Sequence, residues 1–504
     1  MRLRDRLWNP NVIVFLSSAC IMVIELVASR LIAPRLGVSL YTWTAVIGVI
    51  LAGISLGNYI GGRLADRFAS GPFLGLIFAL AALASLSILW LNNAMHEVQL
   101  PVSWPLMIWV LGYIAAVYFL PCTILGCVSP IVVKLSLKDL NRSGSTVGKI
   151  YAWSSVGSIV GTFATGFFLI SWFGTKTIVL LVAGLQGLLA LWFLTDTRWW
   201  KAVLFVAVFL GAMGGGYWFL KAGDFLCKEC LRETNYFCIN VYDKEEAGKK
   251  VRELVLDRLV HSYSDIEDPT NLVYGYERTY AQVIRPLVER KPDLAAFFIG
   301  GGGYTFPRYL EATLPQSHVV VAEIDPGVTE VARERLGLIP ETRIENHATD
   351  ARIYMTWYSK PDSYDLIFGD AFNDYSVPYH LTTLEFGHLV DSLLRDDGLY
   401  VVNIVDGGPR GHFMRAYVRT LQQVFRNVAV IPSGSDWRSL SRTTFVIVAS
   451  QAPLELENLE LEDSPLSAEK LAEYMALDPP LILTDEHVPV DNLLAPVFED
   501  SHRS

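Results

Sequence analysis

The sequence predicts an α-helical membrane bundle of about seven spans fused to an α/β domain that begins with a small β-rich region. Three observations lead to this prediction. Hydrophobic residues make up 52% of the 504 positions, which is too large a share for a purely soluble chain of this length. Apolar stretches of about 20 residues, long enough to cross a bilayer, recur between residues 11 and 220. From residue 294 onward, strand patterns alternate with helix patterns, as in domains built on a parallel sheet.

The membrane half is predicted from seven apolar stretches. The first is not a cleavable signal peptide, because "VASRLIAP" lacks a small-residue cleavage site and further stretches follow it. The fourth contains Pro121 and Pro130, so we expect it to be kinked or broken. The predicted spans are 12–33, 42–61, 73–92, 106–133, 152–171, 177–194 and 203–220.

Positive charges predict how these spans are oriented. Lys and Arg gather in alternate loops, which the positive-inside rule assigns to the cytoplasm together with the N-terminus. An odd number of spans then places the second half of the chain outside the cytoplasm, and a count wrong by one places it inside. The residues concerned are Arg2, Arg4, Arg6, Arg63, Arg67, Lys134, Lys138, Arg142, Lys149, Arg198 and Lys201.

Three cysteines follow the last predicted span, in "LCKECLRETNYFC". In an oxidising compartment Cys227, Cys230 and Cys238 would permit a disulfide, whereas in a reducing one they would be free thiols. A zinc site would need a further His or Cys at ligand spacing, and none follows. We therefore expect no metal.

Two features of the membrane half concern its interior. Glu25 and Arg30 fall in the first span, where ionisable groups are costly and mark either a polar pocket or a structural ion pair. The small residues of "GISLGNYIGG" and "GSIVGTFATG" predict close packing between helices rather than the lining of a pore.

The second half divides into three parts by its patterns. "NYFCINVYD" and "VRELVLD" alternate apolar and polar residues and predict a β-rich region over 231–262. Strands and helices then alternate over 290–450, which predicts a parallel sheet with helices on both faces. The predicted domains are residues 1–222 in the membrane, 223–450 as the α/β domain and 451–504 as a tail packed on that domain.

Glycines and acids at the ends of successive strands predict a nucleoside site. Gly300, Gly301, Gly302 and Gly303 follow one strand, and glycines there let the backbone approach a ligand closely. Acids end the next three strands: Glu323 suits a ribose diol, Asp350 an adenine amino group and Asp370 the mouth of the pocket where chemistry occurs. The alternative is that these acids are helix N-caps and turn residues.

An ordered set of motifs resembles a known family. "LVYGYERTYAQVI", "IGGGG" with "AEIDP", "TDAR" and "YDLIFGDAF" follow one another as in the spermidine synthase family of aminopropyltransferases. The resemblance runs from about Asn235 to Ser450. The segment that begins "VIELVASRLIAPRLG" resembles the membrane half of the branch in which such a domain is fused to membrane spans.

The resemblance implies a Rossmann-like fold of the spermidine synthase and methyltransferase type. It also implies an S-adenosylmethionine-type co-substrate, with methylthioadenosine released when an aminopropyl group moves to an amine. Asp370 matches the catalytic acid and Tyr280 a tyrosine of the substrate pocket, while Glu277 matches an acid before that tyrosine. The expected partners are a small amine or polyamine, the lipid bilayer and a second copy in a homodimer, and no nucleic acid. The net charge of −10 is consistent with attraction of a polyamine cation.

Several positions depart from the family pattern and leave the donor and the acceptor open. Synthases that make spermidine carry an Asp where this chain has Gly303, and Tyr304 follows it. Their second acid after the catalytic one is Asn373 here, with Asp374 one place late, and Ala281 replaces a histidine. The donor is therefore intact or decarboxylated S-adenosylmethionine, and Tyr304 and Asp374 are assigned to substrate binding.

Three functions stay open at this stage. The first is a membrane-anchored transferase that moves an aminopropyl or related alkyl group to an amine. The second is a methyltransferase acting on a membrane-borne substrate. The third is a transporter or sensor that binds a nucleoside without chemistry. A domain outside the cytoplasm conflicts with the cytoplasmic synthesis of sulfonium nucleosides, unless the bundle delivers the donor or the span count is wrong by one.

Overall fold

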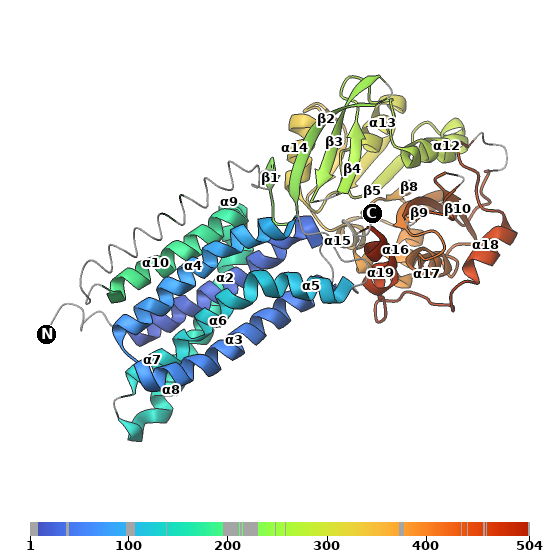
Figure 1. Cartoon of the computed structure of the whole chain (residues 1–504). Helices are drawn as coiled ribbons and strands as arrows, with labels where there is room; N and C mark the ends of the chain where they lie inside the picture. The colour runs from blue at the N-terminus through green and yellow to red at the C-terminus, as the bar shows by residue number, and fades with distance from the viewer. Residues whose placement is uncertain are drawn as a thin grey trace. The chain divides into compact units, whose positions relative to one another are not determined.

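The computed structural model divides the chain into two compact units, Met1–Asn235 and Tyr236–Ser504, rather than at the predicted residue 222 (Figure 1). The predicted seventh span, 203–220, lies outside the described residues except for Gly211 and Gly214. The described residues are 9–36, 40–96, 106–137, 139–194, 211, 214, 230–246, 248–257, 259–371, 377–434, 436–440, 442–456, 459 and 461–501.

The first unit is helical, as predicted. Within the described residues, 6 helices are long and apolar enough to cross a membrane, and they correspond to the first six predicted spans. The helices are α2 (Pro10–Leu36), α3 (Leu40–Phe68), α4 (Gly71–His96), α5 (Leu106–Ile114), α6 (Leu120–Gly126), α7 (Val128–Ser136), α8 (Ser143–Ala164), α9 (Ile170–Phe173) and α10 (Thr175–Leu194). The turns η1 (Ala115–Phe119) and η3 (Thr165–Leu169) are π-helical and η2 (Leu140–Arg142) is 3₁₀.

Glycines bring neighbouring helices of this unit into close contact. A Cβ atom at Gly57 of α3 would lie 2.2 Å from the carbonyl oxygen of Thr123 in α6. A Cβ atom at Gly157 of α8 would lie 2.2 Å from the carbonyl oxygen of Phe15 in α2. The predicted role of the two small-residue stretches in helix packing is therefore confirmed.

The fourth span is one helix over Met107–Ser136, but it departs from regular α-helical geometry near its prolines. The π-helical turn η1 directly precedes α6, in whose first turn Pro121 cannot donate a backbone hydrogen bond. A second irregularity falls at Cys127, three residues before Pro130. In the first predicted span, the guanidinium of Arg30 donates to the carbonyl oxygen of Thr234 at 2.7 Å.

The second unit begins with antiparallel hairpins in the predicted β-rich region. They are formed by β2 (Cys238–Glu246), β3 (Lys249–Leu256) and β4 (Leu259–Ser264), with a register shift between Leu254 and Val255. The short β1 (Arg232–Glu233) ends the first unit. Cys230 and Cys238 are both disulfide-bonded, and Cys227 lies outside the described residues.

A 7-stranded sheet forms the centre of the second unit, in the order β10-β11-β9-β8-β5-β6-β7. Strands β5 to β9 are parallel to one another. Strand β11 runs antiparallel to both of its neighbours, β9 and β10, so the prediction of a parallel sheet was wrong at that edge. No helix joins β10 to β11, and without a crossover two neighbouring strands pair antiparallel. The strands are β5 (Ala295–Ile299), β6 (His318–Ala322), β7 (Glu345–His347), β8 (Tyr364–Gly369), β9 (Leu394–Asp406), β10 (Asn427–Pro432) and β11 (Thr443–Ser450).

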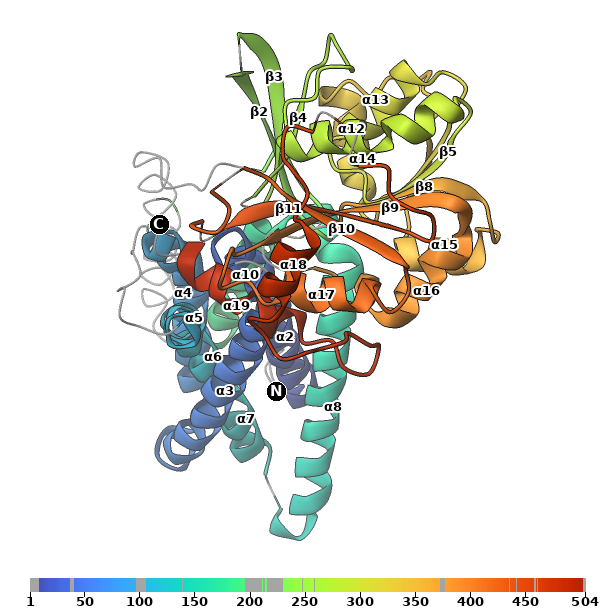
Figure 2. The same ribbon diagram turned by 90° about the vertical axis from the view of Figure 1, so that its right-hand side faces the viewer.

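Helices cover both faces of this sheet, as predicted. Figure 2 shows α12, α13 and α14 over one face and α15, α16 and α17 over the other. Right-handed crossovers produce this division, because the chain moves across the sheet one way from β5 to β7 and the other way from β7 to β9. The helices are α12 (Gly275–Arg290), α13 (Thr305–Thr313), α14 (Pro326–Arg335), α15 (Ala351–Trp357), α16 (Leu384–Leu393) and α17 (Phe413–Leu421).

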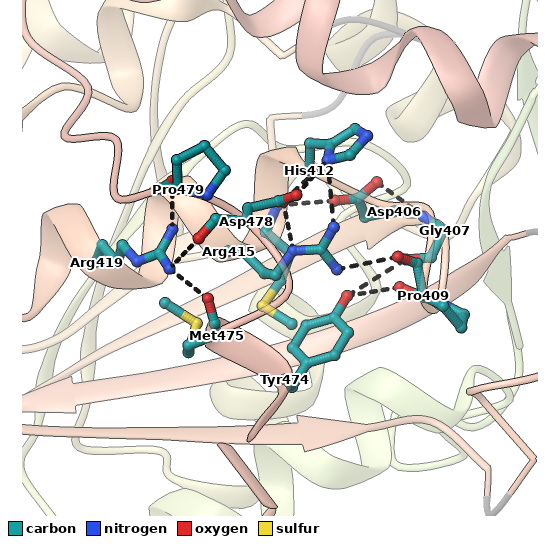
Figure 3. A network of polar contacts seen from close by, with 12 residues as sticks. Asp406, Gly407, Pro409, His412, Arg415, Arg419, Tyr474, Met475, Asp478 and Pro479 are labelled. Carbon is teal, nitrogen blue, oxygen red and sulfur yellow. Dashed lines mark hydrogen bonds and ion pairs between the residues drawn. The ribbon is translucent and has the colours of Figure 1, made fainter. Parts of the chain in front are cut away.

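The C-terminal segment, with α18 (Ala468–Met475) and α19 (Val490–Ser501), contacts the same unit. The buried guanidinium of Arg415 in α17 donates to Asp478 at 2.5 Å and lies 4.8 Å from the centre of the Tyr474 ring (Figure 3). The Tyr474 hydroxyl donates to the carbonyl oxygen of Gly408 at 2.7 Å. These contacts hold the segment against the loop that follows β9.

Candidate functional site

The glycine loop lies where the order of the sheet reverses. Strand β5 has β6 on one side and β8 on the other, and ligands of open α/β sheets bind beyond the carboxyl ends of strands at such a point. Gly300 follows β5 with φ +91°, a conformation that L side chains rarely adopt. A Cβ atom there would also lie 2.8 Å from the carbonyl oxygen of Asp370, which follows β8. The loop and Asp370 are therefore in backbone contact.

Glu323 follows β6 and holds the glycine loop. One carboxylate oxygen accepts the N–H of Gly301 at 2.7 Å and that of Gly302 at 3.3 Å. The other accepts the N–H of Asp325 at 3.0 Å. Burial raises the pKa of Glu323, and the backbone N–H donors oppose that rise. The oxygen that accepts from Asp325 still has a lone pair for a further donor, as a ribose hydroxyl would be.

Asp350 follows β7 and is the N-cap of α15, where its carboxylate accepts the N–H of Ile353 at 3.0 Å. The capping alternative is therefore observed for this residue. Its second oxygen lies 2.7 Å from Nε2 of His380. Burial acts to raise the pKa of Asp350, but the hydrogen bonds from His380 and the backbone outweigh it and lower the pKa. Asp350 is thus an ionised acceptor beside the ends of the strands.

Asp370 is fixed by two hydrogen bonds. The Tyr276 hydroxyl donates to one carboxylate oxygen at 3.0 Å, and the Asn403 amide donates to the other at 2.9 Å. Burial raises the pKa of Asp370, while both hydrogen bonds lower it. A carboxylate oriented from both sides in a partly buried position suits proton transfer.

Glu277 and Tyr280 lie beside Asp370 with polar atoms that lack partners. One carboxyl oxygen of Glu277 and the hydroxyl of Tyr280 are buried and make no well-formed hydrogen bond within the described residues. Burial and the charge of Asp370 raise the pKa of Glu277 well above its usual value. The Tyr280 ring packs edge-on against Tyr276 and Phe306. Buried groups without partners are costly, so this pair points to a missing polar ligand.

Asp370 borders one pocket, and its chain neighbours Gly369 and Ala371 border a second. The first encloses about 350 Å³ of empty space, partly open to solvent, between the glycine loop, β4 and α12. The second encloses about 300 Å³ and is bordered by Gly369, Ala371, Tyr400 and Asn403. The residues around the first are His261, Ser262, Tyr276, Glu277, Tyr280, Phe298, Gly300, Gly301, Gly302, Gly303, Thr305, Phe306, Pro307 and Asp370.

The structure brings most of the predicted site residues together. Gly300 to Gly303, Asp370, Glu277 and Tyr280 border the first pocket, and Glu323 binds the loop from behind. Tyr304 does not border it: its buried hydroxyl contacts Asn346 and lies 2.8 Å from the Thr329 hydroxyl. Asp374 lies outside the described residues.

Four residues at the site were not predicted from the sequence. Tyr276 and Asn403 bind Asp370, and His261 and Ser262 border the first pocket. The alternation of β4 indicates which of its residues share a face, but not that this face meets the glycine loop. Among the described residues, no group of three or more His, Cys, Asp or Glu could hold a metal ion.

Comparisons with known proteins agree with the resemblance seen in the motifs. No protein-family model matches the chain. The chain is 36% identical over 118 residues, 23% of its length and 39% of the relative, to a polyamine aminopropyltransferase of Vibrio vulnificus. It is 27% identical over 224 residues, 40% of its length and 48% of the relative, to a probable polyamine aminopropyl transferase of Bifidobacterium longum. It therefore spans less than half the length of either relative.

Two further comparisons concern a methyltransferase and a solved structure. A Mus musculus protein named eEF1A lysine and N-terminal methyltransferase is 28% identical over 120 residues, 22% of this chain and 17% of that relative. The crystal structure of a probable spermidine synthase from Corynebacterium glutamicum aligns with a TM-score of 0.43 and 21% identity, over 49% of this chain and 93% of that one.

Proposed function

We propose that this protein is a transferase that binds a sulfonium nucleoside of the S-adenosylmethionine type and moves an alkyl group from its sulfur to an amine. One observation carries the proposal. Asp370, held by Tyr276 and Asn403, borders the first pocket at the reversal of strand order, and Glu277 and Tyr280, whose buried polar atoms lack partners among the described residues, border the same pocket. The similarity to polyamine aminopropyltransferases supports it.

The donor is assigned to the glycine loop and the acids beyond it. In this proposal Glu323 accepts hydrogen bonds from the ribose diol and Asp350 accepts one from the adenine amino group. Gly300 to Gly303 border the sulfonium, and their missing side chains allow the close approach. Tyr304 is assigned to support of the glycine loop. Its ring lies close to Gly301, and its hydroxyl contacts Thr329 and Asn346.

The acceptor amine is assigned to Asp370, Glu277 and Tyr280, and the sequence-based assignment of Asp374 to substrate binding is kept as part of the proposal. A neutral amine nitrogen attacks the carbon next to the sulfonium, the carbon–sulfur bond breaks, and its electron pair stays on sulfur as a thioether. Asp370 accepts the proton that leaves the nitrogen. If the propyl carbon is attacked, methylthioadenosine is released. Glu277 binds a cationic amino group of the acceptor by giving up its own proton.

Product analysis of the purified full chain tests this function. The protein is incubated with an amine and with S-adenosylmethionine or its decarboxylated form, and the nucleoside released is identified by mass spectrometry. We expect methylthioadenosine, and we expect Asp370→Asn to lower the rate by about 10² to 10⁴ while the affinity for methylthioadenosine is kept. Asp243→Asn is the control, because this acid is on the surface. Nucleoside binding without any release would contradict a transferase.

A methyltransferase is the second candidate function. Two observations favour it: Gly303 carries no acid for the amine of a decarboxylated donor, and a methyltransferase is among the relatives. Release of S-adenosylhomocysteine in place of methylthioadenosine would identify methyl transfer, and binding with neither product would leave the transporter or sensor.

The membrane setting is also part of the proposal. We place the six long apolar helices and the predicted seventh span, 203–220, in the bilayer as an anchor, with the N-terminus in the cytoplasm. The disulfide-bonded state of Cys230 and Cys238 supports an oxidising compartment for the second unit. A homodimer, which the family resemblance implies, is tested by the mass of the detergent-solubilised chain in light scattering.

A further inference from the structure

One end of the first pocket holds polar groups that the proposed reaction does not use. Ser262 Oγ and His261 Nε2 border this pocket from β4, are buried and make no hydrogen bond within the described part of the chain. A buried donor without a partner is costly. Ser262 Oγ, which lies next to Gly303, therefore points to a polar group of a ligand.

No acid can stand at this end of the pocket in place of Gly303. A Cβ atom on Gly303 would lie 1.9 Å from Ser262 Oγ, so Ser262 excludes any side chain there. The neighbouring hydroxyls, Ser264 and Thr305, lie 3.1 Å apart and hydrogen-bond to each other. The described residues at this end of the pocket thus offer hydroxyl and imidazole groups and no carboxylate, so an ammonium group would lack a charged partner.

The charge around these groups suits an anion. Burial, with a smaller effect of the positive charge of Arg442, lowers the pKa of His261 to about 4, so its ring is neutral near pH 7. The same Arg442 opposes the rise in the pKa of Tyr274 that burial, Glu277 and Glu253 contribute to. His261 and Ser262 are neighbours on β4 and point to opposite faces, so the Ser262 hydroxyl beside Gly303 is the donor that suits a carboxylate.

We propose that this end of the pocket binds a carboxylate, namely the α-carboxylate on the tail of intact S-adenosylmethionine. The inference rests on the proposed function, which places the nucleoside at the glycine loop. That loop borders Glu323 at Gly301 and Ser262 at Gly303, so a donor whose ribose meets Glu323 brings its sulfonium tail to the Ser262 side. The donor is thus not decarboxylated, and an attack on its propyl carbon moves a 3-amino-3-carboxypropyl group.

Titration calorimetry of the full chain with three nucleosides tests the inference. We expect S-adenosylmethionine to bind at least about tenfold more tightly than its decarboxylated form, as a hydrogen bond to a charged group allows. Ser262→Ala should remove most of that preference and leave the affinity for methylthioadenosine, which lacks the tail, within about twofold. The retained methylthioadenosine binding shows that the variant is folded. Ser264→Ala is the matched control and should keep the preference, because its hydroxyl is already paired.

A gain-of-function variant tests the same inference in the opposite direction. Ser262→Gly combined with Gly303→Asp removes the blocking hydroxyl and adds an acid, so the double variant should prefer the decarboxylated donor. An amino-acid acceptor is the alternative source of the carboxylate. Comparing the affinity for 2,4-diaminobutyrate with that for 1,3-diaminopropane tests it, because the two compounds differ only in the carboxylate. A preference confined to the acceptor pair overturns the assignment to the donor.

The outcomes separate this inference from the function on which it rests. If methylthioadenosine does not bind the wild-type chain, the proposed nucleoside site itself fails. If methylthioadenosine binds and the decarboxylated donor binds equally well or better, the nucleoside site stands and the carboxylate inference is overturned.

Discussion

At the scale of single residues, the site places two acids, Asp370 and Glu277, in different hydrogen-bonding surroundings. Asp370 accepts two hydrogen bonds, whereas Glu277 is only 3% exposed and one of its carboxyl oxygens has no hydrogen-bond partner among the described residues. Two acids in one pocket cannot both ionise easily, so the better-solvated one takes the charge. A cationic amine between them would remove the conflict.

This arrangement predicts that amine binding depends on pH through Glu277. Its pKa is raised by burial and by Asp370, so it holds a proton that an ammonium group must displace. The affinity for a diamine should therefore rise with pH until Glu277 is ionised in the free protein, and binding should release a proton. Calorimetry in buffers of different ionisation enthalpy measures this release. Glu277→Gln should abolish it, and a release that persists in the variant would assign the proton to another group.

The sequence could predict the acids of this site but not their partners. Glu323, Asp350 and Asp370 each follow a strand, and the carboxyl ends of parallel strands meet at one edge of a sheet. Asn403 lies within β9 and Tyr276 in the first turn of α12, where nothing in the local pattern distinguishes them from ordinary core residues. Their roles depend on pairing between distant segments, which a single sequence does not specify.

At the scale of elements, the glycine loop predicts unequal effects of two similar substitutions. Gly300 and Gly302 both have positive φ, but only Gly300 has an atom within 4 Å of the added Cβ, the carbonyl oxygen of Asp370. Gly300→Ala should therefore lower the free energy of unfolding by about 3 kcal/mol and weaken methylthioadenosine binding. Gly302→Ala should cost only about 1 kcal/mol. Thermal melts compare the two, and equal losses would show that the contact with Asp370 does not matter.

The C-terminal segment predicts a second difference at this scale. Asp478 pairs with Arg415, whose side chain is 1% exposed, so Asp478→Ala leaves a buried cation without its partner and should destabilise the unit by about 3 kcal/mol (Figure 3). The surface pair of Arg278 with Glu462 is the control. Glu462→Ala should cost less than about 1 kcal/mol, because both side chains are well exposed. Equal midpoints of thermal unfolding for the two variants would mean that the segment does not stabilise the unit.

Element types were easier to predict from the sequence than their pairing. Hydrophobic periodicity indicated the strands, and the prolines indicated the irregular geometry of the fourth span. The antiparallel edge was missed, because the direction of β11 depends on the strand beside it. The π-helical turns η1 and η3 also leave no mark in the hydrophobic pattern, since they only widen a helix that continues.

At the scale of the whole molecule, the orientation of the second unit decides where its donor comes from. Sulfonium nucleosides are made in the cytoplasm, so a unit on the opposite side would depend on delivery through the bundle. Disulfide-bonded Cys230 and Cys238 favour an oxidising compartment. The positive-inside pattern places the second unit on that side if the predicted seventh span crosses the membrane, and in the cytoplasm if only the six described helices do.

Labelling of intact cells with a membrane-impermeant maleimide checks this orientation. We expect Cys238 to be labelled from outside only after treatment with an impermeant reductant, because its thiol is disulfide-bonded before reduction. Cys20 and Cys122 should stay unlabelled in intact membranes, since both are buried in the helical unit. The variant Cys238→Ser controls for the labelled position. Labelling of Cys238 only after the cells are permeabilised would place the unit in the cytoplasm, and with it the donor and the enzyme would share one compartment without any transport step.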